Sequence, residues 1–335
     1  MCSGLIMRLS TVSFLVFCTG YVFAGTTIRS HSQVTGNARE LYEQFKRDYG
    51  KIYSNDDDEK RFVIFKDNLV RAQMYQLQDQ GTAEYGVTQF SDLTPQEFAA
   101  KFLSSRIHSQ VERVQLNDFE AAPQNVDWRQ KGAVGPVEDE GQCRSDWAFS
   151  IAGNIEGQLF RKTGHLYDLS KQQLIDCQLM GGGCNDVYST DTYVEIVKMG
   201  GLELQEDYPY VAKRQHCEMN PSKNVAKISG AVILEVDERR QVAWLAENGP
   251  MSVGLNGNYL QFYRSGISHP SETECPRAEM NHAGLTVGYG TEDNVPYWIV
   301  KNSWGEHWGE KGYFRIYRGD GTCGIHQLAT CAIID

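Results

Sequence analysis

Apolar positions between residues 37 and 104 recur at steps of three and four residues, which is the spacing of one helix face. The run that follows this spacing best consists of Phe62, Phe65, Leu69, Ala72 and Gln76. Three aspartates at positions 56–58 precede it, where acidic side chains suit the positive end of a helix dipole. Residues 37–104, which contain no cysteine, are therefore predicted to form a small helical domain.

The pattern changes beyond this region. Residues 105–122 are polar and follow no period, and they are predicted to form a linker or processing region. Aromatic residues, glycines and most cysteines gather in residues 123–335. There, closely spaced apolar positions predict a helix over 147–163, and short β-type runs predict strands at 231–236, 285–289, 297–301 and 312–317. The second part of the chain is thus predicted to be a compact α+β domain.

The first 24 residues have the pattern of an export signal. Arg8 precedes a largely apolar stretch over 12–23, and Val22 and Ala24 occupy the small-residue positions of a cleavage site. The stretch is too short for a comfortable membrane span, and no later segment approaches one. We expect a protein that is secreted or delivered to a lysosome-like compartment, with no membrane partner once the signal is removed.

Composition and charge narrow the function classes. The 335 residues are 41% hydrophobic and 22% charged, as in an ordinary globular protein, and the net charge is −11. Nucleic acid binding would need a basic patch, so it is not expected. Nothing in the sequence calls for a cofactor.

The cysteines fit an oxidising compartment. Of the nine, Cys2 and Cys18 lie in the export segment, so seven remain in the exported protein. No CxxC pair of the zinc-ribbon type occurs, and a disulfide framework is the better interpretation. Six of the seven can pair and one is left over, while spacing alone leaves the connectivity open.

Four ordered segments of the second domain resemble the active-site segments of papain-family cysteine peptidases. They are Val-Asp-Trp-Arg at 126–129, Gly-Gln-Cys-Arg-Ser-Asp-Trp-Ala-Phe-Ser at 141–150, Asn-His-Ala at 281–283 with Val-Gly-Tyr-Gly at 287–290, and Trp-Ile-Val-Lys-Asn-Ser-Trp-Gly at 298–305. The helical domain resembles the inhibitory propeptide of this family in its cathepsin F version. It matches at Arg61, Phe65, Asn68, Ala72 and Gln76, with Asp57 in place of the leading glutamate, and then at Gly86, Thr88, Phe90 and Asp92.

The resemblance implies a peptidase domain with a helical lobe and a β-barrel-like lobe, and a propeptide lying across the cleft between them. It further implies three disulfides, Cys143–Cys184, Cys177–Cys217 and Cys275–Cys323. Cys331 would be left free, as a small buried residue rather than a reactive thiol.

The site implied by the resemblance departs from the family where the chemistry occurs. His282 and Asn302 stand at the positions of the catalytic histidine and its orienting asparagine, but Asp146 stands where the nucleophilic cysteine is expected. Glu140 replaces the oxyanion glutamine, which places a negative charge where negative charge must develop. Arg144 replaces a glycine beside the site.

Further positions implied by the resemblance would face a bound peptide. Asp186 and Val187 replace two glycines whose backbone pairs with substrate in the family, and their side chains should crowd it. Ala283 and Leu328 would line an apolar specificity pocket. The remaining expected substrate-side residues are Tyr188 and Trp304.

Other readings of the cleft stay open at this stage. Ser145 could act as a nucleophile, although its side chain should point about 100 degrees away from that of Asp146. Glu140, Asp146 and His282 could hold a metal ion, but an ion pair in which Arg144 neutralises the two carboxylates is the simpler expectation, so no metal site is predicted.

Three functions follow from these readings. The favoured one is a non-catalytic peptidase homologue that acts by binding, for example to cystatin-like inhibitors, to peptides or to a partner protein, with its own propeptide as a further partner. The second is residual cysteine-peptidase-type, metal-assisted or serine-assisted hydrolysis in the same cleft. The third is a folded product without function.

Overall fold

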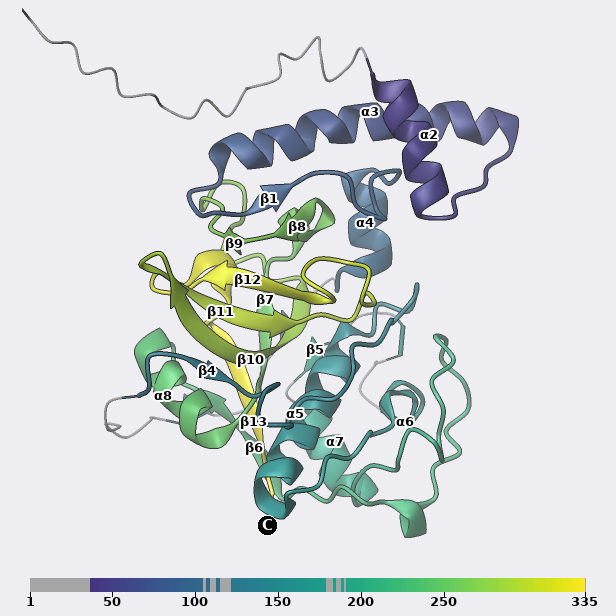
Figure 1. Cartoon of the computed structure of the whole chain (residues 1–335). Coiled ribbons are helices and arrows are strands. Elements are labelled where there is room, and N and C mark those ends of the chain that lie inside the picture. The colour runs from purple at the N-terminus through teal and green to yellow at the C-terminus, as the bar shows by residue number, and fades with distance from the viewer. Residues whose placement is uncertain are drawn as a thin grey trace, which may run out of the picture.

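Figure 1 shows the computed structural model of the chain, which describes residues 37–104, 107–108, 113–114, 122–178, 183–184, 188–189 and 191–334. The predicted export signal at 1–24 lies outside the described residues. Within the described ranges, no helix combines the length and the apolar character that crossing a membrane requires.

The N-terminal domain consists of three helices, α2 (Ala38–Asp48), α3 (Asn55–Gln78) and α4 (Pro95–Phe102). Helix α2 crosses α3 through a buried aromatic cluster in which the ring centroid of Phe65 lies 5.3 Å from Tyr42 and 5.1 Å from Phe45. The predicted helical face is therefore confirmed at its centre: Phe65 and Ala72 are buried. Three aspartates occupy the first turn of α3, where they complement the helix dipole.

The polar residues on α3 tie the helix to the chain that follows it. Arg61 forms an ion pair with Glu97 at 2.9 Å, and the side-chain amide of Asn68 donates to the carbonyl of Leu93 at 2.7 Å. The amide of Gln76 spans the turn before β1 (Glu84–Tyr85) by donating to a backbone carbonyl and accepting from a backbone N–H. Buried backbone groups that lack a regular partner are thereby satisfied.

The helical lobe is built around α5 (Asp146–Thr163), with α6 (Lys171–Cys177) and α7 (Asp191–Met199) beside it. Almost every residue of α5 up to Leu159 is buried, which explains why its apolar positions lie so close together in the sequence. The helix ends at Gly164, whose φ of 74° is a left-handed conformation that glycine adopts at low cost. The prediction of a helix over 147–163 is correct to within one residue.

The other lobe is a twisted, barrel-like sheet whose strands run in the order β3-β6-β13-β7-β10-β11-β12-β9, with β4 paired to β10. The strands are β3 (Arg113–Val114), β4 (Val126–Asp127), β6 (Gly230–Leu234), β7 (Met251–Leu255), β9 (Ile267–Ser268), β10 (His282–Glu292), β11 (Val295–Lys301), β12 (Tyr313–Tyr317) and β13 (Leu328–Ile333). Short helical pieces complete the lobe, namely α8 (Glu238–Asn248), η2 (Asn258–Gln261) and η3 (Thr322–Gly324), whereas η1 (Pro221–Lys223) contacts the segment that follows α7 in the helical lobe.

All four predicted strands overlap observed ones, which are β6, β10, β11 and β12. The prediction missed the central strands β7 and β13. All five residues of β7 are buried, and so are the first five of β13, so neither has the polar alternation that reveals a strand with one solvent face. The two-lobed α+β fold implied by the resemblance is otherwise confirmed.

The predicted linker contains two short strands that pair with the second domain. In β2 (Ile107–His108) the backbone runs parallel to β5 (Tyr188–Ser189), and β3 runs parallel to β6 at the edge of the barrel-like sheet. The N-terminal domain makes a third sheet contact, because β1 pairs with β8 (Tyr263–Ser265). In Figure 1 this domain lies above the two lobes, at the end of the molecule where α4 leads toward α5.

Three disulfides join Cys143 to Cys184, Cys177 to Cys217 and Cys275 to Cys323, which is the pairing implied by the resemblance. Among the described residues, one further thiol, that of Cys331, is free and buried in β13.

Burial raises the pKa of the Cys331 thiol to about 12, so very little reactive thiolate exists at pH 8. We expect the native protein without residues 1–24 to resist alkylation by iodoacetamide at pH 8 and to incorporate one label per chain after unfolding without reduction. Mass spectrometry of the labelled protein measures this. Rapid labelling of the native protein at Cys331 would contradict its burial, and labelling at any other cysteine would contradict the disulfide pairing.

Candidate active site

Three predicted site residues come together where the two lobes meet. Asp146 is the first residue of α5, His282 is the first residue of β10, and Asn302 directly follows β11. The Nε2 atom of His282 lies 2.8 Å from Oδ1 of Asn302, and the ring of Trp304 lies 4.8 Å from the imidazole. The asparagine thus orients the imidazole while the indole covers it.

The Asp146 side chain is enclosed, with 1% of the residue exposed. Its Oδ1 accepts from the hydroxyl of Ser104 and from the backbone N–H of Trp147, both at 2.8 Å. Its Oδ2 accepts from the backbone N–H of Ala283 at 2.9 Å and lies 2.8 Å from Nδ1 of His282. The His282 contact is a close ion-pair approach without an aligned N–H···O bond. An ionised carboxylate, which offers acceptors alone, fits this set of donors.

The partner of Asp146 across the lobe interface is His282, at the ion-pair distance given above. The reason is geometric. The start of α5 directs the Asp146 side chain across the lobe interface toward β10, where it contacts the imidazole of His282 and the backbone N–H of Ala283.

Glu140 supplies the second carboxyl group of the site, and its burial affects the pKa of that group. The side chain is fully buried, where Oε1 accepts from the indole N–H of Trp304 at 2.8 Å and Oε2 accepts from the backbone N–H of Ser145 at 2.6 Å. Burial, reinforced by the nearby charge of Asp146, raises the pKa of the Glu140 carboxyl well above its usual range, and these hydrogen bonds oppose the shift only in part. Burial thus favours the neutral carboxyl at this position more than the sequence suggested, while the two N–H donors favour the anion.

Two other readings of the cleft find no support. The hydroxyl of Ser145 lies 2.8 Å from the hydroxyl of Tyr210, and no hydrogen bond joins it to His282. Across the described ranges, no group of three His, Cys, Asp or Glu side chains is placed to hold a metal ion. Glu140, Asp146 and His282 fail as a metal set because the carboxylate oxygens already face N–H and O–H donors.

The expected peptide-facing residues have different outcomes. Ala283 of β10 and Leu328 of β13 flank Gly254 of β7 on opposite sides, and each is 2% exposed within the core cluster of the helical lobe. Asp186 and Val187 lie outside the described residues. For Tyr188 the structure describes the backbone pairing with Ile107, so the linker runs where a peptide was expected to bind.

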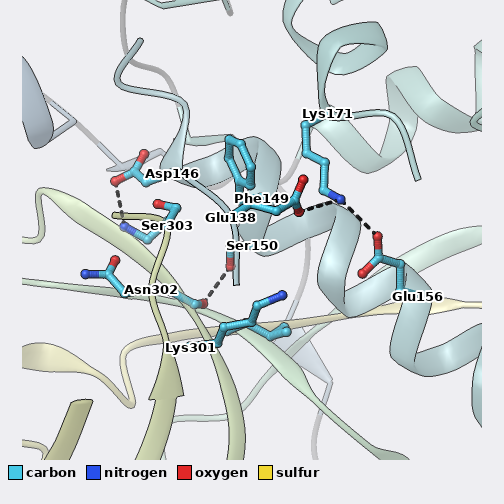
Figure 2. A pocket seen from close by; sticks show the side chains of 12 residues that line it. Glu138, Asp146, Phe149, Ser150, Glu156, Lys171, Lys301, Asn302 and Ser303 are labelled. Atoms are coloured by element: carbon cyan, nitrogen blue, oxygen red, sulfur yellow. Dashed lines mark hydrogen bonds and ion pairs between the residues drawn. The ribbon is translucent and has the colours of Figure 1, made fainter. Parts of the chain in front are cut away.

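A small polar cavity of about 10 Å³ lies behind the site, between the lobes, and is shown in Figure 2. Lys171 reaches into it from α6 and contacts Glu138 at 2.7 Å and Glu156 at 3.3 Å. Lys301 points toward the same space, and burial lowers the pKa of its ammonium group. This cluster was not predicted from the sequence, because its members are far apart in the chain and belong to no spaced motif.

The N-terminal domain closes the site from outside. Phe90, Phe98 and Phe102 direct their rings edge-on at Trp304, with centroids 5.2, 5.5 and 6.3 Å away. The side chain of Gln89 donates to the carbonyl of the same tryptophan at 3.3 Å. Sequence reasoning placed Phe90 in a propeptide motif but did not foresee that these rings converge on the neighbour of His282.

Comparisons with known proteins agree with this architecture. Residues 122–333 match the papain family of cysteine proteases, and residues 42–98 match the cathepsin propeptide inhibitor domain (I29). The chain therefore belongs to the papain family of cysteine proteases and carries the inhibitory prodomain of the cathepsins.

Its relatives include cathepsin F from Mus musculus, 41% identical over 88% of this chain, and cathepsin F from Drosophila melanogaster, 39% identical over 92%. The chain spans 65% and 52% of the lengths of these two proteins. Among solved structures, digestive procathepsin L 3 from the larval midgut of Tenebrio molitor is similar with a TM-score of 0.79 and 34% identity, covering 89% of this chain and 99% of that one. The chain is thus a cathepsin F homologue with a prodomain of the procathepsin type.

Proposed function

We propose that this cathepsin F-like member of the papain family is catalytically inactive and acts by binding. In this proposal Asp146 occupies the position of the nucleophilic cysteine, while His282 and Asn302 keep the positions of the base and its orienting partner. Glu140 occupies the oxyanion position. The export-type leader and the three disulfides support a secreted or lysosome-like location.

The observation that carries the proposal is the environment of the Asp146 carboxylate. Its oxygens accept three hydrogen bonds and approach the imidazole, so the group is held as a stable anion. A nucleophile must instead be free to attack and to leave, and an acyl-aspartate is an anhydride that lies uphill from the amide it would replace. Loss of the nucleophile from such a catalytic unit costs several orders of magnitude in rate.

The retained fold supports binding as the remaining role. The lobes, the prodomain and the aromatic cluster around Trp304 are assembled as a complete unit. Such a unit offers surfaces for a partner protein, and its cleft, once vacated, could take cystatin-like inhibitors or peptides as a decoy.

The test is a peptidase assay of the protein after an added protease has digested the whole prodomain and the fragments have been separated from the peptidase domain. We expect no turnover of a fluorogenic dipeptide substrate between pH 4 and 8, with or without a chelator, and retention of the protein on immobilised cystatin. The added protease alone is the control. Turnover above that control would refute inactivity, and loss of that turnover with chelator would point to a metal site.

A further inference from the structure

The segment that follows α4 delivers one hydroxyl group into the candidate active site. Ser104 is 2% exposed, and its Oγ donates to Oδ1 of Asp146 at 2.8 Å. This bond joins the N-terminal domain directly to the first residue of α5. Both partners are buried, so the bond is shielded from competing water.

The carboxylate oxygen Oδ1 of Asp146 favours a hydrogen-bond donor at the position that Ser104 occupies. Oδ1 of Asp146 has one protein donor from the same lobe, the N–H of Trp147, and its second donor is Ser104. A buried carboxylate that loses a donor keeps the desolvation penalty, whereas a hydroxyl at hydrogen-bond distance removes it. A side chain without a donor at this place would therefore be disfavoured, and a further carboxylate would be repelled.

The neighbouring residues hold Ser104 in register. Leu103 packs where Gly257 leaves room: a Cβ on that glycine would lie 3.0 Å from Cδ2 of Leu103 and 2.8 Å from Cβ of His282. Phe102 lies edge-on to Trp304, whose ring lies against the imidazole of His282. Farther away, the β1–β8 pairing fixes the same domain to the barrel-like lobe. The hydroxyl is thus presented by a segment whose two preceding residues pack beside the site.

We propose that Asp146 forms a subsite for a hydroxyl-bearing side chain and that its occupant is Ser104 of the chain's own pro-segment. The prodomain then remains bound as a permanent part of the protein even after the linker is cut. This inference rests on the proposed function in one respect, namely that Asp146 serves as an acceptor and not as a nucleophile. It also ranks the binding modes: a ligand that enters the cleft must first displace residues 102–104, whereas a partner that binds the outer surface need not.

The test uses the full chain with a recognition sequence for a site-specific protease placed within residues 115–121. After cutting, we expect the two pieces to co-elute in size-exclusion chromatography. Dissociation is timed by labelling the prodomain with a fluorophore and diluting the complex into unlabelled competitor. Ser104→Ala should accelerate dissociation by roughly tenfold or more, because it removes a buried hydrogen bond to a charged group.

A double-mutant cycle separates the proposed bond from mere packing. In an Asp146→Ala background, Ser104→Ala should have little further effect, since the acceptor is already gone. Asp146→Ser serves as a second background that keeps a polar atom at the start of α5. Equal effects of Ser104→Ala in all backgrounds, or immediate separation of the parent pieces, would overturn the proposal. Turnover of a peptide by the cut sample would count against the proposed function instead, because dissociation is measured without substrate.

Discussion

Replacing Asp146 by cysteine together with Glu140 by glutamine is expected to create peptidase activity, with a gain of roughly 10³-fold or more over the parent chain. The thiol would sit at the N-terminus of α5, with Nδ1 of His282 on the side that Oδ2 of Asp146 now approaches at 2.8 Å. Both the helix dipole and a protonated imidazole favour the thiolate, which is the nucleophile this family uses. Glutamine at position 140 restores a donor for the oxyanion.

Turnover of a fluorogenic dipeptide, measured after an added protease removes the prodomain, gives the result. A thiol-directed inhibitor should abolish it and count the active sites. The matched control is Asp146→Ala with Glu140→Gln, which removes the carboxylate without supplying a nucleophile and should stay inactive. If the double revertant is folded but no faster than this control, the proposed roles of positions 140 and 146 are wrong or incomplete, and glycines at 186 and 187 are the next changes to make.

Glu140→Gln alone is expected to change the pH dependence of stability. The pKa of the Glu140 carboxyl is raised in the folded state, so its contribution to stability is complete below the unfolded pKa of about 4.3 and is lost as the pH rises toward the folded value. Each unit of that shift corresponds to about 1.4 kcal/mol. Glutamine cannot ionise, so the free energy of unfolding of the variant relative to the parent should increase from pH 4 upward.

The sign of the difference in unfolding free energy between Glu140→Gln and the parent at low pH also follows from the structure. Both carboxyl oxygens of Glu140 face N–H donors, from Trp304 and Ser145, and glutamine must turn its NH₂ toward one of them. The variant should therefore be less stable than the parent near pH 4, by about 1–3 kcal/mol, and should recover as the pH rises. Urea unfolding at several pH values measures both effects. A stability difference that does not change between pH 4 and 8 would show that Glu140 does not titrate in this range. Glu310→Gln, which removes a carboxylate that is ion-paired with Arg315, is the control for general charge effects.

Much of the fold was predictable from local sequence. The helix over 147–163 was recognised by its closely spaced apolar positions, because nearly all of α5 is buried. Apolar positions on α3 follow a helical period because one face of that helix is buried. Strands with a mixed environment, such as β11 and β12, were found for the same reason. The fully buried β7 and most of β13 were missed, since a strand buried on both faces carries no alternation. The pairs of strands in the linker were missed because two residues are too few to show any pattern.

In the site, too, some features were predictable from the sequence and others were not. The residue types at 140, 146, 282 and 302 are written in the sequence, and the resemblance placed them in one cleft. Their charges and partners were not, because these depend on burial and on neighbours distant in the chain. The low-dielectric surroundings of Glu140 raise the pKa of its carboxyl, and the packing of β10 against α5 brings His282 within 2.8 Å of Asp146.

The sequence by itself determined the family, the helical prodomain and the residue types at positions 140, 146, 282 and 302. Tertiary structure alone decided that Asp146 is sealed by a serine of the pro-segment, that Glu140 is buried beside it, and that three phenylalanines close over Trp304. The physical reason is that residue identity fixes which donors, acceptors and charges exist. Only the packing of distant segments fixes which of them meet without water between them.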